Sequence, residues 1–257
     1  MTHELLRTFS SPLVFGHRGF SSIAPENTLS SIQACIDHGV QGVELDVQPC
    51  ASGELVVIHD DDVSRVTGAK GIVKEMPLDA LRSLDAGSHF HPSFSGERIP
   101  LLDEVFSQFG KTLVYDLEIK SREIRNPYPA KAVWELIRKH GIAHRCIVSS
   151  YNPFQVRFFE RISRKQVPTA VIFADDPRVP WILRRGWGRV ITNSSVIKPH
   201  YPQLTPWRFW LYRNLKGCAV ITWTVDDPEL IRSFKAMGVW GIITNNPKQA
   251  MQVIATD

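Results

Sequence analysis

The chain has 257 residues, of which 43% are hydrophobic and 22% are charged, and its formal net charge is +4 at pH 7. This composition is typical of a globular enzyme with one large domain or two small ones, and it excludes a disordered chain and a repeat array. The mild positive charge fits an anionic ligand without requiring one. No run reaches the roughly 18 apolar residues of a membrane span, and the N-terminus lacks the apolar core of a secretion signal. We therefore expect a soluble, cytoplasmic protein with no stable membrane insertion.

The cysteine pattern indicates reduced thiols. The four cysteines are Cys35, Cys50, Cys146 and Cys218, and they form no CxxC pair. Three of them lie inside apolar stretches, as packed thiols do, whereas a disulfide framework or a zinc site would need a regular spacing. We predict that all four are free.

Short apolar runs rich in β-branched residues alternate with helical patterns along the chain. The predicted strands are residues 13–16, 42–48, 112–120, 146–151, 169–173, 189–194, 219–225 and 241–244. The predicted helices include residues 27–39, 129–141, 153–165 and 227–238. Strands that alternate with helices indicate a parallel sheet, and eight such strands in about 250 residues predict an α/β fold of the (β/α)₈ TIM barrel type. A doubly wound sheet is the alternative, but its usual G-x-G-x-x-G turn is absent from the sequence.

Two segments interrupt the alternation after the second predicted strand. Residues 42–60 predict a β-hairpin with Ser52 and Gly53 at its turn. Residues 60–100 fit neither a plain helix nor a strand, and they are too many for a simple connection. We predict that they form a small insertion over the top of the barrel, within a single domain of residues 1–257.

Acidic residues alternate with apolar ones on two of the predicted strands. Glu44 and Asp46 share one face of their strand, and Glu118 and Lys120 share one face of theirs, because side chains alternate along a strand. Carboxylates that point into a barrel are costly unless something compensates them. A hard cation such as Mg²⁺ or Ca²⁺ would do so with oxygen ligands. A structural ion-pair network that includes Arg18 and Lys120 is the alternative.

Two histidines and an arginine lie at predicted strand ends. His17 ends the first strand and His59 ends the hairpin, so both are expected at the carboxyl-terminal mouth, where barrel enzymes place catalytic groups. A pair of imidazoles suits general acid–base catalysis near neutral pH. The planar guanidinium of Arg18 can bind phosphate oxygens through two parallel hydrogen bonds, and Lys120 can add a second positive charge. Such a site suits a phosphodiester better than a neutral sugar.

Eight motifs occur in order from His17 to Pro247: HRG, APENT, GVELDVQ, ELVVIHDDDVSRVTG, IPLLDEV, LEIK, WTV and GIITNNP. With them the chain resembles the glycerophosphodiester phosphodiesterases. The resemblance implies a barrel with a small insertion after the second strand. It also implies metal-dependent hydrolysis of glycerophosphodiesters to sn-glycerol 3-phosphate and an alcohol. The residues that it places in the site are the metal ligands Glu44, Asp46 and Glu118, the acid–base pair His17 and His59, and the phosphate-binding Arg18 and Lys120.

The resemblance further implies one divalent ion, Mg²⁺ or Ca²⁺ with Mn²⁺ as a third choice, and a nucleophilic glycerol hydroxyl that forms a cyclic phosphate; direct attack by water is the alternative. We prefer His59 as the acid because it adjoins the predicted insertion.

Asn27 is a plausible cap for the first helix. Two positions depart from the family's WTVN and TDxP patterns, namely Asp226 and Asn245.

Two further functions remain open. The first is a lysophospholipase D-type reaction on lysophospholipids, for which the aromatic and basic residues of 205–217 could touch lipid, although an outer helix that packs its aromatics on the barrel is favoured. The second is a non-catalytic barrel that binds anions or nucleic acid. Suitable residues at all seven site positions argue against the second function. We therefore expect a small-molecule substrate and no nucleic-acid partner, and the sequence predicts no oligomeric state.

Overall fold

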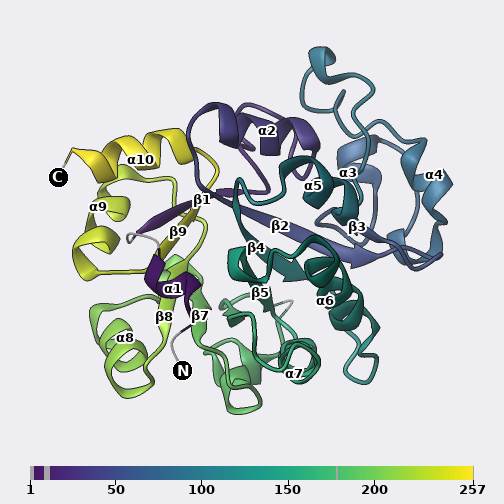
Figure 1. The fold of residues 1–257 in the computed structure, drawn as a ribbon. Coiled ribbons are helices and arrows are strands. Elements are labelled where there is room, and N and C mark those ends of the chain that lie inside the picture. Colours follow the sequence, from purple (N-terminus) through teal and green to yellow (C-terminus); the bar gives the residue numbers. More distant parts are fainter. Residues whose placement is uncertain (1–2, 9–11, 178, 257) are drawn as a thin grey trace.

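The computed structural model describes residues 3–8, 12–177 and 179–256. Eight parallel strands form a closed barrel because β1 pairs with both β2 and β9 (Figure 1). In barrel order these strands are β1 (Leu13–His17), β2 (Gly42–Pro49), β4 (Val114–Ile119), β5 (Cys146–Ser150), β6 (Thr169–Phe173), β7 (Val196–Pro199), β8 (Ala219–Thr222) and β9 (Gly241–Thr244). The predicted TIM barrel is confirmed.

Helices surround the barrel and cover one end of it (Figure 1). The outer helices are α2 (Leu29–Asp37), α5 (Leu102–Phe109), α6 (Tyr128–His140), α7 (Pro153–Ile162), α8 (Pro206–Trp210) with the π-turn η7 (Leu211–Leu215), α9 (Pro228–Met237) and α10 (Pro247–Ala255). The short helix α1 (Leu5–Thr8) covers the amino-terminal end of the barrel, where Leu5 packs in one cluster with Leu13, Phe15 and Val114. Among the described residues, no helix is long and apolar enough to cross a membrane.

Short single turns connect these elements. They are η3 (Ala143–Arg145), η4 (Trp181–Leu183), η5 (Trp187–Val190) and η6 (Tyr201–Gln203).

All four cysteines are free and buried, as predicted. Burial raises the pKa of the Cys35 thiol to about 12, so this sulfur stays protonated and unreactive at neutral pH.

The prediction of a strand at residues 189–194 is wrong. The chain turns there through η5, and the strand β7 begins only at Val196. The reason is local hydrogen bonding by polar residues: the backbone N–H of Asn193 donates to the carboxylate of Glu160 at 2.9 Å, and the hydroxyls of Thr192 and Ser194 lie 2.8 Å apart. These contacts hold a turn, and the backbone N–H of Asn193 is bonded to a side chain of another element instead of to a neighbouring strand.

The predicted hairpin is confirmed by the antiparallel pairing of β2 with β3 (Leu55–Val57). Its turn contains Gly53 at φ +101°, which a residue with a side chain rarely adopts. Between β3 and α5 lies the segment that the sequence predicts as an insertion. It contains α3 (Ser64–Thr67), η1 (Val73–Glu75), α4 (Leu78–Arg82) and η2 (Pro92–Phe94), and its apolar cluster, with Val63, Leu81 and Ile99, is separate from the barrel core.

Candidate active site

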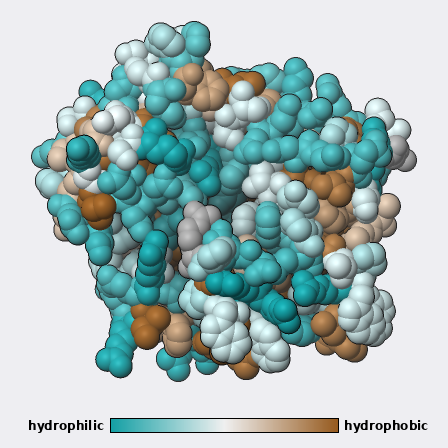
Figure 2. Space-filling view, turned by 180° about the vertical axis from the view of Figure 1, so that it is seen from behind, coloured by the Kyte–Doolittle hydropathy of each residue, from teal (hydrophilic) through white to brown (hydrophobic). Residues whose placement is uncertain are grey.

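A polar pocket opens at the carboxyl-terminal end of the barrel, opposite α1. Figure 2 shows this face, which is hollowed near its centre. All seven residues predicted for the site line the pocket, together with five others. The lining residues are His17, Arg18, Glu44, Asp46, His59, Glu118, Lys120, Tyr151, Ile172, Lys198, Trp223 and Ile243.

Three carboxylates lie together at the base of the pocket. Glu44 and Asp46 point inward from β2 and Glu118 from β4, where Asp46 and Glu118 are register partners. One oxygen of each of the three lies within 4.8 Å of the others. Burial, followed by the charge of Asp46, raises the pKa of Glu44 well above its usual value. A buried set of carboxylate oxygens at this spacing suits a hard divalent cation.

The same carboxylates also contact two cationic side chains. The pocket therefore contains both groups that the sequence analysis considered, an acidic cluster suited to a metal ion and an ion-pair network. Lys120 Nζ lies 2.8 Å from Glu118 Oε1 and 3.5 Å from Asp46 Oδ1, and Arg18 Nε lies 3.3 Å from Asp46 Oδ2. Burial opposes ionisation of Asp46, but the charges of Lys120 and Arg18 outweigh it and hold the pKa of Asp46 far below its usual value. Two positive side chains face three carboxylates, so one negative charge is left that a proton or a metal ion can neutralise.

Lys198 is a buried cation that the sequence reasoning missed, because the strand that carries it was placed seven residues too early. It points into the barrel from β7, where its Nζ lies 2.7 Å from Asp116 Oδ2 and donates to Ser149 Oγ at 3.0 Å. Lysine is almost never fully buried unless it is paired. A lysine inside the apolar run VIKP was therefore the signal that could have identified it.

The loop after β1 is held in an unusual backbone conformation. Arg18 has φ +58°, a left-handed value that costs an L-residue about 1 kcal/mol or more. Three hydrogen bonds fix it: the Arg18 N–H donates to Glu44 Oε2 at 3.3 Å, and the Arg18 carbonyl accepts from Asn27 N at 2.8 Å and from Ser31 Oγ at 3.0 Å. Gly19 follows at φ +88°, where a Cβ atom would collide with Ser31. The HRG motif is thus a tight turn that holds Arg18 above the carboxylates.

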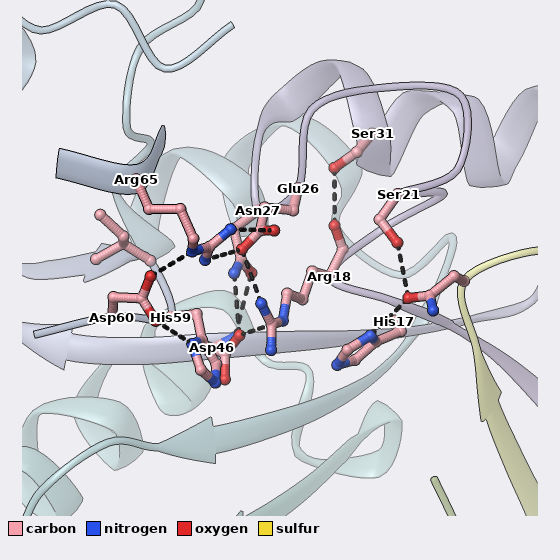
Figure 3. Close-up of polar contacts among 12 residues, drawn as sticks. His17, Arg18, Ser21, Glu26, Asn27, Ser31, Asp46, His59, Asp60 and Arg65 are labelled. Carbon is pink, nitrogen blue, oxygen red and sulfur yellow. Dashed lines mark hydrogen bonds and ion pairs between the residues drawn. The ribbon is translucent and has the colours of Figure 1, made fainter. Parts of the chain in front are cut away.

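The prediction that Asn27 caps the first helix is wrong. Thr28 is the N-cap of α2, and its side chain accepts a hydrogen bond from Ser31 N. Asn27, at φ +57°, instead turns inward, and its Nδ2 donates to Asp46 Oδ2 at 3.0 Å (Figure 3). Asn27 therefore supports a carboxylate of the site, which only the three-dimensional contact reveals.

His17 has one ring nitrogen fixed by a neutral partner. His17 Nδ1 donates to Asn245 Oδ1 at 2.7 Å, because the Asn245 amide is oriented by Asp226: Nδ2 donates to Asp226 Oδ2 at 2.7 Å and the backbone N–H to Asp226 Oδ1 at 2.8 Å. Nε2 of His17 is then the basic nitrogen. Burial, followed by the charge of Arg18, lowers the pKa of His17 to about 4, so it is neutral at pH 7. The two positions that depart from the family patterns thus act together on His17.

His59 has a charged partner instead. Its Nδ1 lies 2.6 Å from Asp60 Oδ1, and Asp60 accepts from Arg65 Nε at 2.5 Å. Arg65 continues to Glu26 at 2.7 Å, and Glu26 accepts from Arg18 Nη1 at 2.8 Å (Figure 3). A carboxylate beside an imidazole stabilises the positively charged imidazolium. The two histidines of the pocket therefore have different partners, a neutral amide at His17 and a carboxylate at His59.

Aromatic side chains form the remaining wall of the pocket. Trp223 meets Tyr151 edge to face with ring centroids 5.9 Å apart, and the centroid of the His200 ring lies 4.9 Å from that of Trp223. The indole N–H of Trp223 donates to the Lys198 carbonyl at 3.1 Å, which fixes the ring. This wall offers an apolar surface to part of a ligand whose charged group contacts the opposite side.

Comparisons with known proteins agree with this geometry. The model of the glycerophosphoryl diester phosphodiesterase family matches residues 17–249. A glycerophosphodiester phosphodiesterase of Caldanaerobacter subterraneus subsp. tengcongensis is 33% identical over 245 residues, which cover 94% of this chain and 97% of the relative. One of Bacillus altitudinis is 29% identical over 247 residues, with 93% and 97% covered. An Oleispira antarctica phosphodiesterase, solved in complex with the product sn-glycerol-3-phosphate, superposes with a TM-score of 0.83 at 26% identity and covers 95% of this chain and 97% of its own. By sequence and by structure, the chain belongs to the glycerophosphoryl diester phosphodiesterase family.

Proposed function

We propose that this protein hydrolyses glycerophosphodiesters to sn-glycerol 3-phosphate and an alcohol, with a divalent cation held by Glu44, Asp46 and Glu118. The observation that carries the proposal is the meeting of three kinds of group in one pocket: an acidic triad, two cations and two imidazoles. The names of the relatives, and the product in the Oleispira antarctica phosphodiesterase, support the same substrate class.

The acidic triad fits Mg²⁺ or Ca²⁺ because its donors are all carboxylate oxygens, and nitrogen or sulfur donors are absent from the cluster. When bound, such an ion supplies positive charge at a phosphoryl oxygen and lowers the pKa of a neighbouring hydroxyl. Glu44 contributes as a ligand only after it loses the proton that its raised pKa favours. Cation binding and proton release are therefore coupled at this residue.

His17 acts as the general base. Its Nε2 is free of the hydrogen bond that occupies Nδ1, and its lowered pKa keeps it neutral at pH 7. It takes the proton of the attacking hydroxyl as a new P–O bond forms. The glycerol 2-hydroxyl is the nucleophile that we favour, and water then opens the cyclic phosphate.

His59 acts as the general acid. Its Nδ1 lies 2.6 Å from Asp60 Oδ1, which leaves Nε2 as the nitrogen that transfers a proton. It gives this proton to the oxygen of the departing alcohol as the P–O bond to that oxygen breaks. The sequence analysis favours the same assignment, and the different partners of the two rings support it.

Arg18 and Lys120 stabilise the negative charge of the phosphoryl oxygens. Arg18 is held beside the triad, with Nε 3.3 Å from Asp46 Oδ2 and Nη1 donating to Glu26 Oε1 at 2.8 Å. Lys120 is held by Glu118 and Asp46 at the edge of the triad. Both charges are preorganised, and a preorganised charge costs little rearrangement as negative charge develops on the phosphoryl group.

A leaving-group experiment tests the division between the histidines. His17→Ala and His59→Ala should each lower kcat by about 10²–10⁴-fold on a glycerophosphodiester with an alkyl alcohol. A nitrophenyl ester of glycerol phosphate needs no acid, so it should restore His59→Ala and leave His17→Ala slow. Equal restoration of both variants, or of neither, would contradict the assignment. A parallel screen of glycerophosphocholine, glycerophosphoethanolamine and lysophospholipids with Mg²⁺, Ca²⁺ and Mn²⁺ decides the substrate and the metal.

A further inference from the structure

An exposed surface of aromatic, aliphatic and basic side chains lies on the outside of the barrel. We name it the aromatic–basic surface. Large exposed apolar side chains that gather on neighbouring segments often mark an interaction site. Its apolar members, with their exposed fractions, are Trp181 (79%), Ile182 (53%), Trp187 (62%), Val190 (80%), Trp207 (65%), Trp210 (44%) and Leu215 (66%).

Two connections of the barrel form this surface side by side. The first runs from β6 to β7 through η4 and η5, and the second runs from β7 to β8 through α8 and η7. Gln203 Nε2 donates to the Arg184 carbonyl at 3.0 Å, and Arg189 Nη2 donates to the Lys216 carbonyl at 3.2 Å, so hydrogen bonds join them at two places. In Figure 1 the two segments are neighbours below β7 and β8, and pale and brown side chains gather along the lower edge of Figure 2.

The second connection divides its aromatic residues between the core and the outside. Phe209 and Tyr212 are buried against the barrel, and the Tyr212 ring lies 6.2 Å from Phe173. Trp207 and Trp210 point outward and stack on each other with ring centroids 5.1 Å apart. The expectation that the aromatics of this segment pack on the barrel is thus correct for one face only. The outer face contributes nothing to the core.

The charge of the region is mainly positive, because its acidic residues are Asp175 and Asp176 at the start of the first connection, and Asp175 lies 3.9 Å from Arg184. Residues 177–225 contain no acidic residue and eight basic ones, and they include five of the seven tryptophans of the chain. Arg185, Arg213 and Lys216 are exposed, and none of these three side chains forms an ion pair with a carboxylate among the described residues. The surface therefore presents unneutralised positive charge beside exposed indole rings.

We propose that the aromatic–basic surface docks on a bilayer of anionic phospholipids. Tryptophan is favoured at the boundary between lipid headgroups and acyl chains, and each Lys or Arg near an anionic bilayer strengthens its binding. Aliphatic side chains such as Val190 and Leu215 gain by entering the lipid and would gain nothing from a nucleic acid. A second copy of this chain is a poor occupant, because two like-charged surfaces would face each other across a symmetric contact. The proposal concerns attachment alone and does not depend on the hydrolase activity.

Binding to vesicles tests the proposal. Co-sedimentation of the whole protein with vesicles of phosphatidylcholine alone, and of phosphatidylcholine with phosphatidylglycerol, should show binding at least about tenfold tighter to the anionic vesicles. Salt should weaken this binding, because exposed charges are screened. The tryptophan emission should shift to the blue on binding as indole rings leave water.

Two double variants address the two components of the surface, and each has a matched control. Trp207→Ser/Trp210→Ser removes outward indoles, and Phe90→Ser/Ile124→Ser removes exposed apolar side chains elsewhere. We expect the former to lose about tenfold or more of the vesicle affinity and the latter to keep it. Thermal unfolding of each variant verifies that it is folded.

Arg185→Glu/Lys216→Glu reverses charge within the surface, and Lys70→Glu/Lys74→Glu makes the same change on exposed residues outside it. The first should lose the preference for anionic vesicles and the second should retain it. Equal binding to both kinds of vesicle, or equal losses in surface and control variants, would overturn the proposal. Retention on RNA, or concentration-dependent self-association, without vesicle binding would also overturn it and would assign the surface to that other partner.

Discussion

Exchanging two residues behind His17 should move a negative charge without changing the net charge or the number of hydrogen-bonding groups. In the structure the Asp226 carboxylate reaches His17 only through the Asn245 amide, by two successive hydrogen bonds of 2.7 Å. The double variant Asp226→Asn/Asn245→Asp places the carboxylate next to the imidazole and the amide behind it. The pKa of His17 should rise, because a carboxylate in contact with Nδ1 stabilises the imidazolium.

The size of the effect follows from the distances. At an effective dielectric constant of about 20, a charge about 3 Å away contributes about 6 kcal/mol and one about 7 Å away about 2.5 kcal/mol. The difference of about 3 kcal/mol corresponds to a rise of about 2 in the pKa of His17. The value should therefore increase from about 4 to the neighbourhood of 6.

Two measurements check this prediction. NMR titration of ¹⁵N-labelled, metal-free protein gives the pKa of His17 directly. In kinetics, a base works only when deprotonated, so the decline of kcat/KM on the acid side should begin about two pH units higher in the double variant. Asp226→Asn alone removes the distant charge, so it should leave the pKa of His17 unchanged or lower. An unchanged titration of His17 in the double variant would refute the orienting role given to Asp226 and Asn245.

Three other groups give further predictions. Glu44→Gln should weaken Mn²⁺ binding in calorimetry at least about tenfold, and an unchanged affinity would remove Glu44 from the ligand set. The affinity of the wild-type protein for Mn²⁺ should decrease as the pH is lowered, because Glu44 must lose a proton to bind the ion. Lys198→Met should lower the free energy of unfolding in urea by about 3–5 kcal/mol because it leaves Asp116 charged and buried, and adding Asp116→Asn should restore most of it. Burial opposes ionisation of Glu26, but hydrogen bonds from Arg65 and the charge of Arg18 outweigh it and lower its pKa to about 2. Glu26 therefore contributes up to about 3 kcal/mol of stability above pH 4.5, which is lost as the pH falls toward 2, so Glu26→Gln should be less stable at pH 6 and approach wild type near pH 2.

Local chemistry was sufficient to predict the barrel and the seven candidate site residues. Apolar runs separated by helical periods specify a parallel sheet, and the alternation of side chains along a strand brings Glu44 and Asp46 to one face without further information. His17 ends a parallel strand, and the ends of parallel strands meet at one mouth. His59 instead follows β3, whose antiparallel pairing with β2 returns the chain to Asp46, where Ile58 N donates to the Asp46 carbonyl. The family motifs then attach roles to these positions. The hairpin turn at Gly53 is equally local, because its positive φ favours glycine.

The tertiary structure decided the surroundings that make these residues different from one another. Asn245 and His17 are 228 positions apart and meet only because β9 closes the barrel against β1. The position of β7, and with it the burial of Lys198, depends on the contact of Asn193 with Glu160 from another helix. Periodicity records which face of an element is apolar, but it carries no information about which distant partner each polar atom finds. The sequence by itself therefore determined the fold and the candidate residues, whereas the charge state and orientation of each residue came from contacts between segments far apart in the chain.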